Sequence, residues 1–199
     1  IATGTPVFGK YNVKKGRVFY IDEENGEIEI KSRLKRIMDG LNIVECDIDF
    51  MIYKNLKLEH KEEKELRGKH QLFIKNYIEE RRPVLVICDS MVRFMKGNEN
   101  SSEDVREIFD FIKPFKEKTS WLLLHHTPKG NDADARGSSD WFAQVDDALI
   151  LNRLGGKHNF KLSSKASRRN NWLPGEKYQI VGEEHEPLIF DYKGQDERV

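Results

Sequence analysis

The sequence is poor in cysteine and has no long apolar segment. It contains 2 cysteines, Cys46 and Cys88, in 199 residues. They are too far apart for a CxxC motif, and two thiols cannot build a disulfide scaffold, so we expect a reducing, cytoplasmic environment. No apolar run approaches the roughly 18 residues that mark a transmembrane helix, and no signal peptide is visible, so we expect no membrane partner.

The chain also has no excess of charge of either sign. Lys and Arg total 34, Asp and Glu total 34, and the formal net charge is zero. This excludes a histone-like polycation, and any nucleic-acid contact must come from a local patch. The charged fraction of 34% exceeds the common value of about 25% and predicts a folded domain with a heavily charged surface.

Short apolar runs alternate with helical patterns along most of the chain. We expect strands at 17–22, 49–53, 84–88 and 120–124, and helices at 27–41, 69–80 and 103–115. We expect further short strands at 148–152, 158–163, 178–181 and 188–192. This order predicts an α/β fold with an open, mostly parallel sheet flanked by helices, which the C-terminal strands extend in antiparallel fashion. The run VLVIC at 84–88 is apolar on both faces and predicts a central strand.

Three of the expected strands end in polar residues. These strand ends carry Asp22–Glu23–Glu24, Asp89–Ser90 and His125–His126. Ligands of open α/β sheets bind at the carboxyl ends of the strands, where a carboxylate can hold Mg²⁺ or activate water and a histidine can sense a phosphate. Taken singly, two acids after a strand are usually residues of a solvated loop. Asp89, taken singly, is typical of a residue that caps the turn after a strand.

One apparent motif is rejected. Residues 4–10 (GTPVFGK) match the first seven places of the phosphate-binding pattern GxxxxGK[ST], but Tyr11 stands where the Mg²⁺-binding hydroxyl belongs. No strand pattern precedes this segment and no helical pattern follows it.

In combination, the motifs resemble a known family. The apolar run ending in Asp89–Ser90, the segment HHTPKG at 125–130 and the segment RGSS at 136–139 occur in that order. This set resembles the RecA-like ATPases, and most closely the hexameric helicases of the RepA type and their AAA_25 relatives. The resemblance implies one RecA-like ATPase core over residues 1–199. The family's phosphate-binding loop is expected upstream of Ile1, so we expect a core that is incomplete at its N-terminus and hydrolyses ATP poorly without that loop.

The resemblance assigns roles to individual residues. Glu24 matches the catalytic glutamate, with Glu23 as the fallback, and His126 matches the residue that senses the phosphate. Arg136 matches an arginine finger that acts on the nucleotide of a neighbouring subunit. Asp89 matches the Mg²⁺ ligand.

Further residues are expected to bind nucleotide or DNA. By the same resemblance, Ser90 and Lys165 belong to the nucleotide site. DNA contacts are expected from the loops that contain Arg93 and Lys129. Trp141 is weighed as a base-stacking residue against a role in the core.

The resemblance implies ATP and Mg²⁺ as cofactors, single-stranded DNA as partner and a homo-oligomer, expected to be a hexameric ring. The function it implies is ATP hydrolysis coupled to DNA transactions, in a RepA- or DnaB-like helicase or a replication or recombination ATPase. Two alternatives remain: a regulatory ATPase of the KaiC or RadA-paralogue kind that does not unwind DNA, and a degenerate core that only binds.

Overall fold

The computed structural model describes residues 1–52, 64–95, 100–126, 140–155, 158–168, 175–181 and 186–195. Within these ranges, the strands form one parallel and one antiparallel sheet of four strands each. No helix in the described part of the chain is both long and apolar enough to cross a membrane.

The parallel sheet contains the first four strands in the order β2-β1-β3-β4. Its strands are β1 (Val18–Asp22), β2 (Ile48–Ile52), β3 (Leu85–Asp89) and β4 (Ser120–Leu123). The sequence prediction of a parallel sheet with 84–88 near its centre is therefore confirmed. Because all four strands run the same way, their carboxyl ends meet at one edge.

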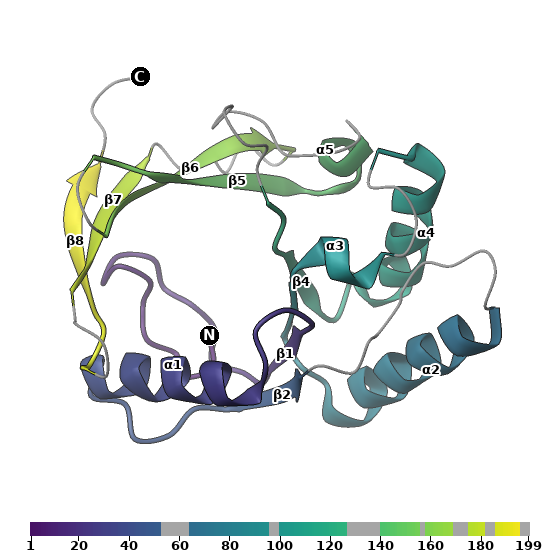
Figure 1. The fold of residues 1–199 in the computed structure, drawn as a ribbon, viewed down its shortest axis with the longest axis horizontal. Coiled ribbons are helices and arrows are strands. Elements are labelled where there is room, and N and C mark those ends of the chain that lie inside the picture. The colour runs from purple at the N-terminus through teal and green to yellow at the C-terminus, as the bar shows by residue number, and fades with distance from the viewer. Residues whose placement is uncertain are drawn as a thin grey trace.

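Helices cover the two faces of this sheet unequally. Figure 1 shows α2 (Lys64–Arg81) and α4 (Ser102–Ile112) on one side, and α1 (Glu27–Gly40) on the side of the second sheet. The apolar stripe of α4 is buried, and Ser101 caps its N-terminus. In α1, by contrast, Ile30 alone is buried.

The unequal cover of the two faces of the sheet is visible in the burial of alternate residues along β3. Val86 and Cys88 are fully buried in the core that α2 and α4 cover. Leu85 and Ile87, which face the other way, are only half-buried, and their neighbour Leu122 on β4 is 42% exposed. The apolar run predicts burial on both faces, but within the described residues only one face is fully covered.

Two short helices are absent from the sequence prediction, α3 (Met91–Phe94) and α5 (Asp140–Gln144). With 4 and 5 residues, they are too short to show a helical period. A 3₁₀ turn, η1 (Lys113–Phe115), follows α4.

The last four strands form an antiparallel sheet in chain order, β5-β6-β7-β8. They are β5 (Asp147–Arg153), β6 (Asn159–Ser167), β7 (Glu176–Val181) and β8 (Ile189–Gln195). The sequence pattern predicts that these strands extend the parallel sheet. That detail is wrong for the described residues, where no ladder joins β4 to β5 and the antiparallel strands form a sheet of their own.

The second sheet arches over the first and reaches α1 at its far strand (Figure 1). The amide of Leu188, just before β8, donates to the carbonyl of Arg36 at 2.9 Å. Gly40 permits this approach, because a Cβ there would lie 1.9 Å from the Leu188 carbonyl oxygen. The end of α1 therefore supports the edge of the antiparallel sheet.

The N-terminal segment packs against the second sheet through a tight turn at residues 7–11. The ring of Phe8 lies 5.4 Å from that of Tyr178 and 5.7 Å from that of Tyr192. Lys10 pairs with Glu176 at 3.2 Å. The segment that matches GxxxxGK[ST] is thus bound to another sheet, with no helix after it, and its rejection as a phosphate-binding loop is confirmed.

Candidate functional site

The predicted site residues gather at the carboxyl edge of the parallel sheet. Register pairs Asp22 with Asp89, so β1 and β3 end side by side. The amide of Leu124 donates to the carbonyl of Cys88 at 3.0 Å, which brings the end of β4 to the same edge. Glu24, the Asp89–Ser90 pair and the histidines after β4 therefore start from neighbouring positions.

The turn after β1 is built around Asp22, which is fully buried. Its Oδ1 accepts hydrogen bonds from the amides of Glu24 at 2.9 Å and Asn25 at 3.0 Å. This Asx turn fixes the backbone that carries Glu24. Asp22 belongs to one of the polar strand ends that the sequence predicts at the ligand-binding edge, and an aspartate that ends a strand is a known turn former.

Glu24 is the centre of the hydrogen-bonded group at this edge. Its Oε2 accepts the hydroxyl hydrogen of Ser90 at 2.6 Å and lies 3.3 Å from Nε2 of His126. The bond from Ser90 lowers the pKa of Glu24, and His126 and the charge of Arg93 act in the same direction against the effect of burial. The side chain remains 33% exposed, so Glu24 is an ionised carboxylate that water can reach.

Glu23 is more deeply buried than Glu24. It is 8% exposed, and its amide donates to the carbonyl of Asp89 at 2.8 Å. Because a residue that activates water must meet the solvent-filled side of the site, the geometry favours Glu24 over Glu23 for that role.

Asp89 is held by a residue that the sequence analysis did not single out. The hydroxyl of Tyr20 donates to Oδ2 of Asp89 at 2.5 Å. Burial raises the pKa of Tyr20, and the bond to Asp89 raises it further, so the phenol stays a neutral donor. Sequence patterns count a tyrosine within a strand as apolar, which is why this polar role was missed.

The donor set fits Mg²⁺ at Asp89. In the described part of the chain, no cluster of three or more His, Cys, Asp or Glu side chains could hold a metal ion alone. Mg²⁺ beside a nucleotide needs fewer protein ligands, since it is bound by one or two carboxylates together with phosphates and waters. Asp89, with Oδ2 on Tyr20, can supply one such carboxylate oxygen.

The two histidines differ in their surroundings. His126 is exposed and meets Glu24. His125 packs edge-on against Trp141 with ring centroids 5.0 Å apart, and its Nε2 has no hydrogen-bond partner among the described residues. Trp141 is 6% exposed and also packs against Phe109, so it belongs to the core rather than to a base-stacking surface.

The remaining predicted residues lie apart or outside the described ranges. Arg93 is exposed on α3, near enough for its charge to act on Glu24. Lys165 lies on β6, exposed, where the pairing with β5 shifts by one residue. Such bulges locally change the direction of side chains. Lys129 and Arg136 lie outside the described residues.

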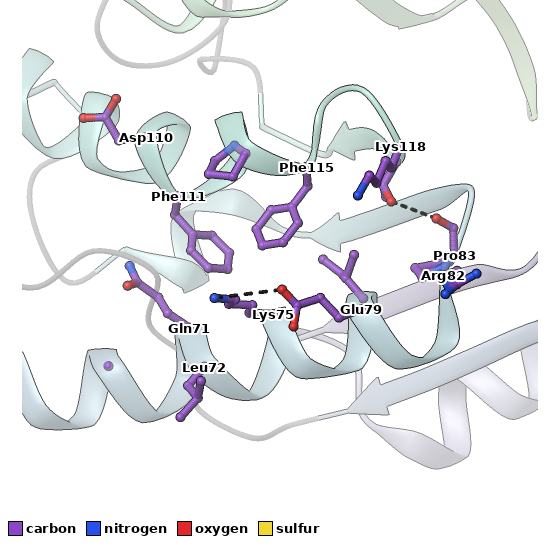
Figure 2. Close-up of a pocket in the computed structure, with 14 residues that line it drawn as sticks. Gln71, Leu72, Lys75, Glu79, Arg82, Pro83, Asp110, Phe111, Phe115 and Lys118 are labelled. Carbon is purple, nitrogen blue, oxygen red and sulfur yellow. Dashed lines mark hydrogen bonds and ion pairs between the residues drawn. The ribbon is translucent and has the colours of Figure 1, made fainter.

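A cavity of about 1080 Å³ lies at the opposite edge of the sheet. Pro83 and Thr119, which line it, lie just before the first residues of β3 and β4. Figure 2 shows Phe111 and Phe115 above it and Lys75 paired with Glu79 along α2. None of the predicted site residues that the structure describes lines this cavity, so it is separate from the carboxyl-edge site.

Comparison with known proteins gives a family and a fold for this chain. Residues 1–132 match the model of a family described as an AAA domain, AAA_25. Among solved structures, the crystal structure of the RadB recombinase is similar, with a TM-score of 0.60 and 13% identity over 87% of this chain and 78% of that chain. At that identity, the similarity concerns the fold. A search of curated proteins gave no match.

Proposed function

The chain belongs to the AAA domain family and has a RecA-like fold, and from this premise we propose that it acts as an ATPase that couples ATP hydrolysis to a DNA transaction. One observation carries the proposal. The ionised carboxylate of Glu24 is held by Ser90 and His126, beside Asp89, at the edge where open α/β sheets bind ligands.

The chain's own residues take distinct parts in the proposed reaction. Glu24 orients a water molecule and accepts its proton as the water oxygen bonds to the γ-phosphorus. The bond from that phosphorus to the bridging oxygen breaks, and its electron pair leaves with ADP. Asp89 holds Mg²⁺, which neutralises charge on the phosphates when bound. His126 links Glu24 to the segment after β4 and so reports the state of the phosphate.

The proposal requires a phosphate-binding loop, which we place in a segment upstream of Ile1. The half-exposed apolar side chains Leu85, Ile87 and Leu122 offer a face on which a helix can pack. Within the described residues β4 pairs only with β3, so its other edge can accept a strand. A strand–loop–helix unit there would bring backbone amides to the carboxyl edge, where phosphates bind.

The DNA partner and the assembly belong to the same proposal. We propose single-stranded DNA, contacted by Arg93 and Lys129, and a homo-oligomeric ring of six subunits in which Arg136 reaches the neighbouring nucleotide. The similar structure is by its title a recombinase, which favours recombination over helicase unwinding as the transaction.

The test is Mg²⁺-dependent phosphate release by the full-length protein, with and without single-stranded DNA. We expect hydrolysis that requires Mg²⁺ and rises when single-stranded DNA is added. A strand-displacement assay and a strand-exchange assay then separate unwinding from recombination. Failure to bind ATP in the presence of Mg²⁺ would contradict the proposal.

A further inference from the structure

Tyr20 reaches Asp89 across two neighbouring strands of the parallel sheet. Register pairs Tyr20 with Ile87 and Asp22 with Asp89, and side chains two residues apart on a strand share a face. Tyr20 and Asp89 are therefore diagonal neighbours on one face. The distance from the tyrosine hydroxyl to Oδ2 of Asp89 is 2.5 Å.

The sheet itself fixes the position of this hydroxyl. Tyr20 lies on β1, which has β2 on one side and β3 on the other. Its half-buried ring packs at a tilt against Phe50 of β2, with centroids 5.7 Å apart. The donor is thus placed by two strands and a packed ring rather than by a loop.

We propose that Tyr20 is a positioning residue that sets the Mg²⁺ affinity of the site by holding the carboxylate of Asp89. One oxygen of Asp89 is bound by a neutral donor, which fixes the rotamer and leaves Oδ1 for the ion or for one of its waters. Mutation of residues that orient metal ligands in this way typically costs roughly 10- to 100-fold in metal affinity or activity. The inference rests on the proposed function, in which Asp89 holds Mg²⁺.

The test is the Mg²⁺ dependence of fluorescent ADP binding to the full-length Tyr20→Phe protein. Removal of one hydroxyl keeps the ring and its packing. We expect the Mg²⁺ concentration for half-maximal binding to rise roughly 10-fold, while binding in excess chelator stays at the wild-type level. This readout involves no turnover.

Tyr77→Phe is the matched control. Tyr77 also donates its hydroxyl hydrogen to an aspartate of the same sheet, Asp49, which lies near the start of β2 and away from the carboxyl edge. Both variants lose one tyrosine–aspartate bond, so we expect comparable losses in melting temperature. Only Tyr20→Phe should shift the Mg²⁺ dependence.

A double-mutant cycle tests whether Tyr20 acts through Asp89. In an Asp89→Asn background, Tyr20→Phe should add no further shift. An unchanged or lower Mg²⁺ requirement in Tyr20→Phe, an equal shift in Tyr77→Phe, or a full additional shift in the Asp89→Asn background would each overturn the positioning role. If the wild-type protein binds ADP without regard to Mg²⁺, the proposed function itself fails, and the role of Tyr20 fails with it.

Discussion

Ser90 and Glu24 follow different strands, yet the hydroxyl of Ser90 donates to Oε2 of Glu24 at 2.6 Å. A second bond runs in the opposite sense, from Tyr20 of β1 to Asp89 of β3. Of the two acids, Glu24 follows β1 and is held by the residue after β3, whereas Asp89 ends β3 and is held by a residue of β1. The two carboxylates are fixed relative to one another before any nucleotide arrives, which is what a preorganised site requires.

Ser90→Ala should change the pH dependence of turnover. The bond from Ser90 is the main cause of the lowered pKa of Glu24. Since Glu24 acts as a carboxylate, activity is lost as pH falls through its pKa. Without the bond that pKa rises, so the acid limb of the kcat–pH profile should move to higher pH while the protein stays active at neutral pH.

Ser101→Ala supplies the control for that profile. Ser101 caps α4 by accepting a bond from the amide of Asp104, away from the site. Its loss should lower stability by about 1 kcal/mol and leave the acid limb in place. An unchanged acid limb in Ser90→Ala would show that Ser90 does not tune Glu24.

The buried Glu176 should make stability depend on acid pH. Burial alone would raise its pKa, but hydrogen bonds from Tyr11, Tyr192, Gln195 and Lys10 outweigh that effect and lower the pKa to about 2. Because the folded pKa lies below the ordinary 4.5, the stabilisation is present above that value and is lost as pH falls toward 2. Urea unfolding, measured at a series of pH values from neutral down to about 2, gives the free energy of unfolding and therefore the loss of this stabilisation.

Glu176→Gln should reduce the free energy of unfolding at neutral pH by roughly 1–3 kcal/mol and flatten its dependence on acid pH. Glu29→Gln is the comparison, since it breaks only an exposed helical pair with Arg33 and should cost well under about 1 kcal/mol. Equal effects of the two variants would argue against a special role for the buried carboxylate.

Arg136→Ala should leave ATP affinity unchanged and cut hydrolysis by about 10³-fold. An arginine finger acts on a neighbour's nucleotide, so an excess of Glu24→Gln subunits should restore part of the activity. A mixed interface then pairs an intact arginine with an intact glutamate. If the two variants assemble together without any gain in ATP hydrolysis, Arg136 does not act in trans.

The sequence predicted the parallel sheet well because each strand is a local apolar run. It also predicted that Glu24, Asp89 and His126 meet, because parallel strands end at a common edge. It failed where pairing is not local. Nothing in the pattern of β5 reveals whether it joins β4 or begins a new sheet, because both choices bury the same alternating residues.

The bond from Tyr20 to Asp89 escapes a sequence pattern for a related reason. Tyr20 lies within β1, where a pattern of apolar residues defines a strand and says little about its polar atoms. Its role depends on register with β3, which pairs Tyr20 with Ile87 and Asp22 with Asp89. Register is a property of two strands, and no single segment of the sequence records it.

The most direct test of the central claim is ATP hydrolysis by full-length Glu24→Gln, with Glu23→Gln measured alongside. Gln keeps the shape of the side chain but cannot take a proton from water. We expect Glu24→Gln to bind ATP and Mg²⁺ as the wild type does and to turn over roughly 10²- to 10⁴-fold more slowly, with Glu23→Gln retaining most of its activity per folded molecule. Turnover by Glu24→Gln within a few-fold of wild type would contradict the account.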